Sequence, residues 1–419
     1  MDIFFIFLYI GNLLNYIDRG LVSTLLPTLS KEFNMTHVQE GMFSSSFMIG
    51  YAIFSLIFSY LCSKTNKLYL LLFGFTLWNI STIIMYTSKD MTYLYVGRSL
   101  SGIGEASFQS IVPIFLVDLY GKTEGLKKSS IFFTAIAVGY SIGMLIGGCI
   151  ENWRYIYLVE GIFGFIIQCT LLKFYNQYHK ISNISYNSSF NMPIIRSDFD
   201  IVCTIFKTRE WWYTIIAYTF ISYSSGVLSL WAPTIYKTNF LENINYEILV
   251  SILASITLSS GIIGSVLGNK YNNYMTTIGF KRYNVFRMGV IVSIICLIST
   301  VFSILVQLGF TLCLISLFIS LVCFSFLTML NSNIVISCVP QDCISYCTSL
   351  CLLFIHLGGD MPSPLISSAL WSYFDDLVYA SLLSHISLIF AIFIYSYSYF
   401  KVKKTTNTLA LFKKTIIEV

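Results

Sequence analysis

Residues 20–28 read Gly-Leu-Val-Ser-Thr-Leu-Leu-Pro-Thr, and residues 226–234 read Gly-Val-Leu-Ser-Leu-Trp-Ala-Pro-Thr. Glycine, serine, proline and threonine coincide in the two stretches, which lie 206 residues apart. The same offset places residues 59–66 over residues 265–272, where serine, leucine, lysine and asparagine coincide. Two windows at one offset, close to half of the 419 residues, predict that the chain is an internal duplication.

The composition restricts the class of protein. Hydrophobic residues make up 56% of the chain and charged residues 11%, whereas a soluble globular protein is about one quarter charged. So little charge excludes soluble enzymes, disordered tails and secreted disulfide scaffolds, and the basic residues lie between apolar runs, which argues against a nucleic-acid partner. The apolar segments are continuous and about 20 residues long, which favours membrane-spanning helices over the roughly 10-residue strands of a β-barrel. The sequence predicts an all-α polytopic membrane protein.

The apolar runs define the expected spans. The first begins at Phe4 with no basic segment before it, which predicts a spanning helix and not a cleavable signal. We expect twelve spans, at residues 3–28, 42–62, 68–87, 92–120, 129–150, 153–174, 211–236, 247–269, 284–306, 309–338, 342–371 and 376–400. Parallel six-helix repeats are the architecture of secondary transporters, with a binding site at the midplane.

The polar interruptions suggest the domain organisation. We expect an N-terminal six-helix bundle (1–175), a central cytosolic loop (176–209), a C-terminal six-helix bundle (210–400) and a basic cytosolic tail (401–419). Of the 25 lysines and arginines, 18 fall in segments on one side of the membrane, four on the other and three inside spans. Because basic residues stay on the cytosolic side, this asymmetry predicts that both termini are cytosolic.

Charged residues inside the spans are the informative ones, because each costs at least ~2.5 kcal/mol at the bilayer centre. The first span carries Asp18 and Arg19, and the fourth carries Arg98 and Glu105, which are seven residues apart and so share a face. We interpret these four as an ion or substrate path; static ion pairs are the alternative. The repeat aligns the first two with Ser224 and Ser225, so the chemistry is expected mainly in the N-terminal half.

Other polar groups lie inside spans as well. His356 and Asp360 stand at i and i+4, on one face of their helix. Glu160 and Arg287 lie close to a helix start, and their side chains either take part in the charge path or reach toward the membrane surface. His385 is expected to be a packed or interfacial histidine.

Small residues mark helix contacts. Gly139, Gly143 and Gly147 recur every four residues, and Gly261, Gly264 and Gly268 form a similar face. The pattern alone does not distinguish packing within one half from packing between the halves. Eleven cysteines, among them Cys343, Cys347 and Cys351 on one helix face, are expected to be packing residues, so no metal or cofactor is expected.

Several strings resemble a known family. Residues 12–19 read Asn-Leu-Leu-Asn-Tyr-Ile-Asp-Arg, residues 97–107 read Gly-Arg-Ser-Leu-Ser-Gly-Ile-Gly-Glu-Ala-Ser, and residues 356–364 read His-Leu-Gly-Gly-Asp-Met-Pro-Ser-Pro. They resemble helices of the spinster-type lipid transporters of the major facilitator superfamily, as does Leu-Trp-Ala-Pro at 230–233. The resemblance implies two pseudo-symmetric six-helix bundles that move lysophospholipids or sphingoid lipids, in several cases coupled to protons. It also implies a lysosome-like organelle or the plasma membrane as the location.

The resemblance extends to the candidate site residues. It matches the family's functional positions to Asp18, Arg19, Arg98 and Glu105, and its helix 11 pair to His356 and Asp360. We expect a monomeric alternating-access carrier in which the following residues act. Asp18 and Glu105 couple protons, Arg19 and Arg98 hold an anionic headgroup or switch charge, and His356 and Asp360 form a secondary polar site.

The loop after the second span departs from the superfamily. Residues 59–68 lack the acid that normally helps to close the cytosolic gate, so a weaker gate between Lys64 and Asp118 is expected. Two other functions stay open. One is a carrier of a soluble sugar, amino acid or organic anion, since the fold does not fix the substrate. The other is a membrane receptor. An enzyme is not expected, because the sequence has neither His-Glu-x-x-His nor Gly-x-Ser-x-Gly.

Overall fold

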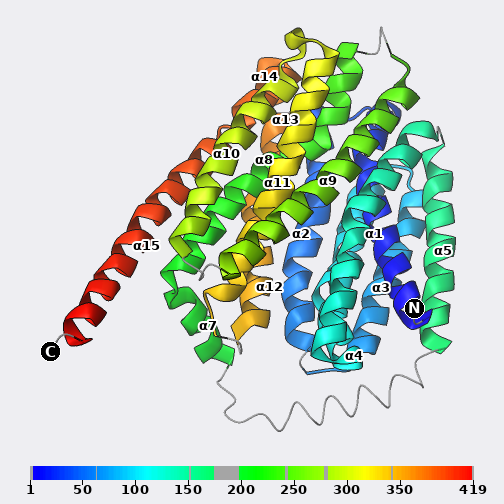
Figure 1. Ribbon diagram of the computed structural model, residues 1–419. Coiled ribbons are helices and arrows are strands. Elements are labelled where there is room, and N and C mark those ends of the chain that lie inside the picture. The colour runs from blue at the N-terminus through cyan, green and yellow to red at the C-terminus, as the bar shows by residue number, and fades with distance from the viewer. Residues whose placement is uncertain are drawn as a thin grey trace.

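The computed structural model describes residues 3–62, 64–150, 152–173, 198–240, 244–277, 282–340 and 343–417. Its N-terminal half is built from α1 (Ile3–Phe33), α2 (His37–Cys62), α3 (Lys67–Tyr86), α4 (Met91–Cys149) and α5 (Trp153–Lys173). Its C-terminal half contains α7 (Asp198–Lys207), α8 (Arg209–Phe240), α9 (Tyr246–Thr277), α10 (Arg282–Ile304), η1 (Val306–Leu308), α11 (Phe310–Ser337), α12 (Ile344–Ile355), η3 (His356–Asp360), α13 (Pro362–Phe374), α14 (Leu377–Ser384) and α15 (Ser387–Ile417). The two halves stand side by side, and both ends of the chain lie toward the same end of the bundle (Figure 1).

The predicted membrane helices are confirmed. Within the described residues, eleven helices are long and apolar enough to cross a membrane. Two of them belong to α4, because the backbone leaves the helical region at Gly121 (φ 77°, ψ 167°). At 31 residues α1 is also long enough, but Asn12, Asn15, Asp18 and Arg19 make it less apolar. It packs inside the N-terminal half and is the twelfth span.

The internal duplication is visible in the packing. Both α1 and α8 contain a proline, Pro27 and Pro233. A Cβ on Gly20 of α1 would lie 2.1 Å from the backbone oxygen of Tyr140, in the fifth span. On Gly226 of α8 it would lie 2.3 Å from Ser363 Oγ, in the eleventh. The repeated glycine therefore lets the first helix of each half approach the fifth helix of the same half.

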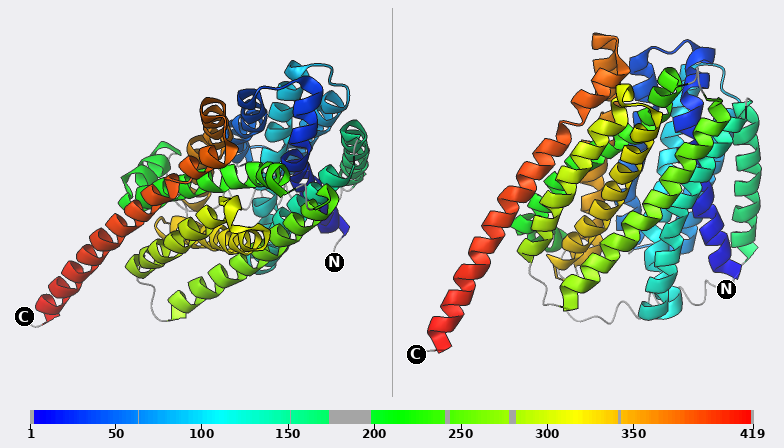
Figure 2. Two further views of the ribbon diagram at one scale, coloured as in Figure 1. Left: turned by 90° about the horizontal axis from the view of Figure 1, so that it is seen from above. Right: turned by 45° about the horizontal axis from the view of Figure 1, so that its top comes forward.

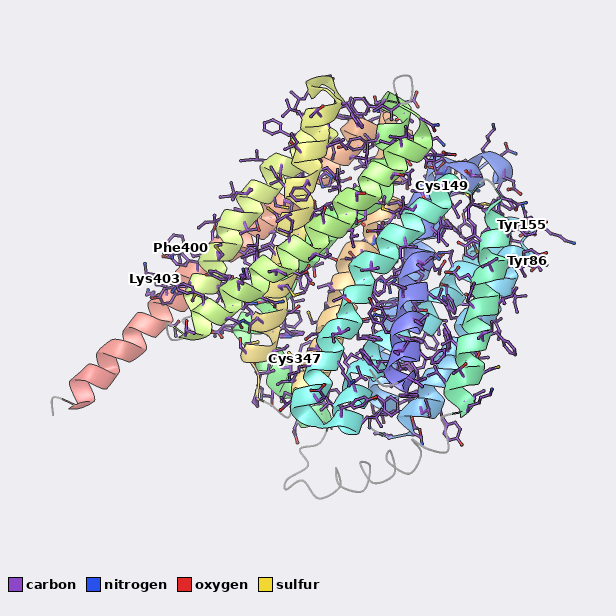
Figure 3. The ribbon with its side chains drawn as sticks, turned by 45° about the vertical axis from the view of Figure 1, so that its right-hand side comes forward. Tyr86, Cys149, Tyr155, Cys347, Phe400 and Lys403 are labelled. Carbon is purple, nitrogen blue, oxygen red and sulfur yellow. The ribbon has the colours of Figure 1, made fainter. Side chains whose placement is uncertain are left out.

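Two long seams join the halves. On one side α2 runs along α12, η3 and α13, with Ser59 Oγ accepting a hydrogen bond from Ser349 Oγ (2.7 Å) and Ser45 Oγ donating to the Met361 carbonyl (2.6 Å). On the other side the second segment of α4 lies against α9, where Gly148 meets Val250. Figure 2 shows α9 crossing in front of α4, and Figure 3 places Cys149 and Cys347 at opposite ends of the bundle.

The structure decides the question left open for the glycine faces. Gly139, Gly143 and Gly147 all face the backbone of α1, and Gly264 and Gly268 face α11, so both faces pack within one half. Gly261 alone of the six faces the other half, where a Cβ would lie 3.1 Å from the methyl carbon of Ala137.

A substitution at the tightest of these contacts should destabilise the N-terminal half. A Cβ on Gly143 would lie 2.1 Å from the backbone oxygen of Ile17. Gly143→Ala must therefore push α1 away, at a cost of about 1–3 kcal/mol. We expect a lower melting temperature in detergent, whereas Gly261→Ala, which meets only a methyl group, should stay close to wild type. Equal melting temperatures for the two variants would contradict this packing.

The described part of the predicted central loop is helical. In α7 the side chains of Ile201 and Ile205 are buried against Trp211, so the helix closes one end of the C-terminal half. The same apolar cluster contains the predicted cysteine stripe, Cys343, Cys347 and Cys351, as packing residues. Residues 176–197 of the predicted loop lie outside the described residues. The predicted tail continues α15 as far as Ile417.

Candidate functional site

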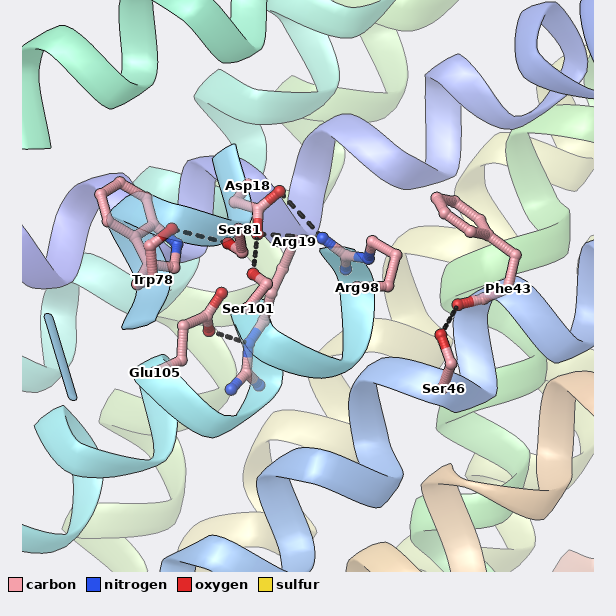
Figure 4. Close-up of polar contacts among 9 residues, drawn as sticks. All are labelled: Asp18, Arg19, Phe43, Ser46, Trp78, Ser81, Arg98, Ser101 and Glu105. Carbon is pink, nitrogen blue, oxygen red and sulfur yellow. Dashed lines mark hydrogen bonds and ion pairs between the residues drawn. The ribbon is translucent and has the colours of Figure 1, made fainter. Parts of the chain in front are cut away.

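The first buried ion pair joins α1 to α4. Arg98 Nη1 donates to both carboxylate oxygens of Asp18, at 2.9 Å each, and Ser101 Oγ donates to Asp18 Oδ2 at 2.5 Å (Figure 4). The side chains of Asp18 and Arg98 are only 2% and 4% exposed. Because the site is so little exposed to water, each charge is stabilised mainly by the other, and removing one leaves the other uncompensated.

The second ion pair, between Arg19 and Glu105, joins the same two helices. Arg19 Nε donates to Glu105 Oε2 at 2.7 Å, and the Arg19 side chain is 14% exposed, against 1% for Glu105. The rings of Tyr16, Phe47 and Tyr51 surround the guanidinium group, with centroids 4.9, 4.7 and 4.5 Å from its Cζ. Aromatic faces stabilise a cation through the ring quadrupole. Arg19 is therefore the more accessible arginine, held in an aromatic box.

Helix geometry explains the crossed pairing. Asp18 and Arg19 are neighbours on α1 and point about 100° apart, whereas Arg98 and Glu105 lie on one face of α4, about 10 Å apart along the axis. Two adjacent residues of α1 therefore pair with two residues of α4 that lie two helical turns apart. All four sequence-predicted residues come together in this way, as two ion pairs between α1 and α4 (Figure 4).

The polar pair of the C-terminal half is assembled separately. His356 Nδ1 lies 2.6 Å from Asp360 Oδ2, and Ser222 Oγ of α8 donates to Asp360 Oδ1. These residues belong to η3, a single π-helical turn, and such turns occur frequently at functional sites. The Tyr51 ring packs edge-on against the His356 ring, with centroids 5.0 Å apart. Tyr51 thus contacts both Arg19 of its own half and the histidine of the other half.

Sequence reasoning missed Ser101 and Tyr51. A signal was present for the first, because Ser101 follows Arg98 by three residues and so shares its helix face. Tyr51 is an aromatic residue in an aromatic-rich span and carries no distinguishing pattern. Its position between Arg19 and His356 depends on the contact of α2 with η3.

A comparison of the sequence with known families decides the class of protein. The sequence profile of the Major Facilitator Superfamily matches residues 8–359. The chain belongs to the major facilitator superfamily. The superfamily's two-bundle architecture agrees with the fold described above.

Relatives within the superfamily confirm the resemblance to spinster proteins. "Protein spinster" of Drosophila melanogaster is 25% identical over 281 residues, covering 65% of this chain and 45% of that protein. "Probable sphingolipid transporter spinster homolog 2" of Arabidopsis thaliana is 26% identical over 413 residues, covering 87% and 80%. This chain spans about half the length of the animal spinster proteins that it matches.

A solved structure agrees with the fold. A bacterial homologue of the human lysosomal transporter spinster, in an inward-facing unoccupied conformation, superposes with a TM-score of 0.75 over 96% of each chain, at 13% identity. At that identity the likeness shows the fold alone, and the roles of individual residues depend on the geometry of this chain.

At the loop that departs from the superfamily pattern, a lysine forms an ion pair with Asp118, the acid of the predicted gate. Lys67 Nζ lies 2.8 Å from Asp118 Oδ2. The predicted partner, Lys64, has its Nζ 2.5 Å from the Tyr60 hydroxyl and 4.0 Å from the centre of that ring. Lys67 is thus an ion-pair partner of Asp118 and a further candidate for the gate.

The opposite end of the bundle holds an acid outside the predicted spans. Glu40 is 6% exposed and accepts a hydrogen bond from Ser30. The His37 ring lies 3.7 Å from the same carboxylate and stacks on Trp371 of the other half, with centroids 3.5 Å apart. This contact joins α1, α2 and α13.

The remaining charged residues of the spans differ in environment. Arg287 is exposed, so it does not join the buried charges. Glu160 is 4% exposed and lies inside the N-terminal half. His385 is fully buried, and its Nδ1 lies 2.6 Å from Ser224 Oγ, the residue that the repeat aligns with Asp18. A serine–histidine contact thus occupies the place of the ion pair in the second half.

Proposed function

We propose that this protein is a secondary active transporter that moves a lysophospholipid or sphingoid lipid by alternating access, coupled to protons. The observation that carries the proposal is the pair of buried ion pairs between α1 and α4. The spinster relatives support a lipid substrate, since the Arabidopsis protein is named a probable sphingolipid transporter. No nucleic acid, cofactor or second copy of the chain enters the proposal.

Asp18 is the proton-coupling residue of this proposal, with Glu105 as the second. Protonation of Asp18 removes its charge attraction for Arg98. The oxygen that binds the proton becomes a donor, so Asp18 can no longer accept all three of its hydrogen bonds from Arg98 and Ser101. In a site so little exposed to water, this change in charge has a large effect on the interaction energy with Arg98. Proton binding is thereby linked to release of α1 from α4.

Arg19 is the better candidate for the substrate headgroup. Its Nη2 is buried and has no hydrogen-bond partner among the described residues, while Nε holds Glu105. A guanidinium group grips a phosphate with two parallel hydrogen bonds. The surrounding rings also suit the cationic choline or amine group of such lipids. Arg98, which is more deeply buried, keeps the charge-switching role.

Tyr51 and the His356–Asp360 pair provide a route between the halves. Because Tyr51 contacts both Arg19 and His356, a movement of the Arg19 side chain shifts the Tyr51 ring and thereby changes the packing of the secondary polar site. Asp118 with Lys67 or Lys64 serves as the gate at the cytosolic end. The proposal places both termini in the cytosol, and the protein in a lysosome-like organelle or the plasma membrane.

Uptake into proteoliposomes tests the substrate assignment. With an inward proton gradient we expect the wild type to take up a lysophospholipid or sphingosine-1-phosphate, but no sugar or amino acid. Arg19→Gln should raise KM for the phosphate lipid at least about tenfold, because hydrogen bonds to charged groups contribute about 1.5–3 kcal/mol. Arg154→Gln, which alters an arginine paired with Glu32 at the surface, is the matched control.

The same assay separates the alternatives. Uptake of a soluble solute without lipid uptake would favour the soluble-solute carrier, since the fold accommodates either substrate. Binding of a ligand without flux of any compound would favour a receptor. An unchanged KM for lipid in Arg19→Gln would show that the headgroup binds elsewhere.

A further inference from the structure

The exceptional acid of the N-terminal half is Glu160, on α5. Four acidic residues in the described part of the chain are almost fully buried: Asp18, Glu40, Glu105 and Glu160. The first three each have a partner, in Arg98, Ser30 and Arg19 respectively. Neither carboxyl oxygen of Glu160 has a hydrogen-bond partner among the described residues. Its side chain therefore does not reach the membrane surface, one of the two positions that the sequence allowed.

The packing of α5 fixes this orientation. Gly161 and Gly164, which follow Glu160, bring α5 against Thr82 and Asn79 of α3. Apart from Lys67 at its start, α3 carries no charged residue, so that helix offers no counter-ion. Tyr157, one turn before Glu160, is also buried, with 1% of its surface exposed. The carboxyl group consequently faces the interior of the half.

The charged groups close enough to act on Glu160 are those of the candidate site. They are Asp18 of α1 and Glu105 and Arg98 of α4, while Tyr157 on the same helix is titratable but carries no charge. The two acids repel a negative charge on Glu160, and the single cation is already paired with Asp18. A buried carboxylate without a hydrogen bond or a cation is strongly unfavourable, and such a group binds a proton instead.

We propose that Glu160 is a neutral, proton-carrying carboxylic acid while Asp18 is ionised, and that it becomes the counter-ion of Arg98 when Asp18 is neutral. The exchange moves one proton from a Glu160 oxygen to an Asp18 oxygen. The number of protons and the net charge of the cluster stay the same. Arg98 is thereby transferred from α1 to α5 without being left as an uncompensated buried cation, which would be strongly unfavourable.

The role of this exchange in transport rests on the proposed function, but the protonation of Glu160 does not. Its first test is infrared spectroscopy of the purified protein at neutral pH. The difference between wild type and Glu160→Gln should contain the carbonyl band of a protonated carboxyl group. In an Asp18→Asn background the same difference should show carboxylate bands instead, because Glu160 then compensates Arg98. Carboxylate bands in the wild-type difference, or an unchanged carbonyl band in the Asp18→Asn background, would overturn the proposal.

Thermal stability supplies the second test. Glutamine has the shape of the neutral acid, so Glu160→Gln should melt within a few degrees of wild type. Combined with Asp18→Asn, it should lower the melting temperature by more than the two single changes together, since Arg98 then lacks both acids. Glu32→Gln, at the surface pair with Arg154, should be additive with Asp18→Asn. Failure of Glu160→Gln to fold where Glu160→Asp folds would show that an ion is needed there and would contradict the proposal.

Neither test requires a substrate. Absence of lipid uptake by the wild type would contradict the proposed function and leave the infrared and melting results to decide on Glu160. Conversely, additive melting temperatures with normal proton-driven uptake would refute the role of Glu160 as a counter-ion of Arg98 and leave the transporter assignment intact.

Discussion

Replacing Asp18 with asparagine is expected to abolish the response of lipid uptake to a proton gradient. Asparagine keeps the shape of the protonated carboxyl group but cannot bind or release a proton. The variant is therefore fixed on one side of the proposed switch, with its contact to Arg98 permanently weakened. We expect uptake to fall to the rate measured without a gradient, at every pH, while exchange of labelled for unlabelled lipid across the membrane persists.

The control for this variant is Asp90→Asn. Asp90 is the N-cap of α4, where its side chain accepts hydrogen bonds from the backbone of Thr92 and Tyr93. Asparagine caps a helix about as well as aspartate, so this change removes a carboxylate from the same protein without touching the buried pairs. An unchanged pH profile in Asp18→Asn, equal to that of the control, would rule out the proton-coupling role.

Replacing Arg98 with glutamine should cause a large, pH-dependent loss of stability. Removing one partner of a buried ion pair costs about 3–5 kcal/mol, because the remaining charge is left uncompensated. A carboxyl group escapes this cost by binding a proton, which a guanidinium group cannot release. The folded variant would then bind more protons than the unfolded chain, so its stability should decrease as the pH rises from acidic to neutral.

A double-mutant cycle measures the pair directly. The double variant Asp18→Asn with Arg98→Gln has no buried charge at either position, so it should be more stable than Arg98→Gln alone at neutral pH. Arg154→Gln is the comparison for an exposed pair: Arg154 and Glu32 are 33% and 37% exposed, and such pairs contribute about 0–1 kcal/mol. Melting temperatures that are additive in the cycle would mean that Asp18 and Arg98 do not interact in the folded protein.

Part of the site was accessible from sequence because of the low dielectric of the membrane. A charge inside an apolar span is costly, so Asp18, Arg19, Arg98 and Glu105 were selected by their cost alone. The seven-residue spacing of the last two placed them on one face. Sequence does not show which side chain of one helix meets which of another, and the crossed pairing required the packed helices.

Glu160 and Arg287 show the limit of this reasoning. Both are charged residues near a helix start, and the sequence treats them alike. In the folded protein α5 buries Glu160 inside the N-terminal half, whereas α10 leaves Arg287 exposed. The difference arises from the rotation of each helix about its own axis, which is set by contacts such as those of Gly161 and Gly164 with α3.

The sequence by itself determined that the chain is a duplicated set of membrane helices with its buried charges concentrated in one half. It could do so because hydrophobicity, charge cost and repeat spacing are properties of single segments. Tertiary structure decided the partners: Asp18 pairs with Arg98, Lys67 pairs with Asp118, and Tyr51 lies between Arg19 and His356. It also left Glu160 without a hydrogen-bond partner among the described residues. These depend on how helices distant in sequence are rotated and packed, because a periodic pattern defines the face of a helix but not the helix that it meets.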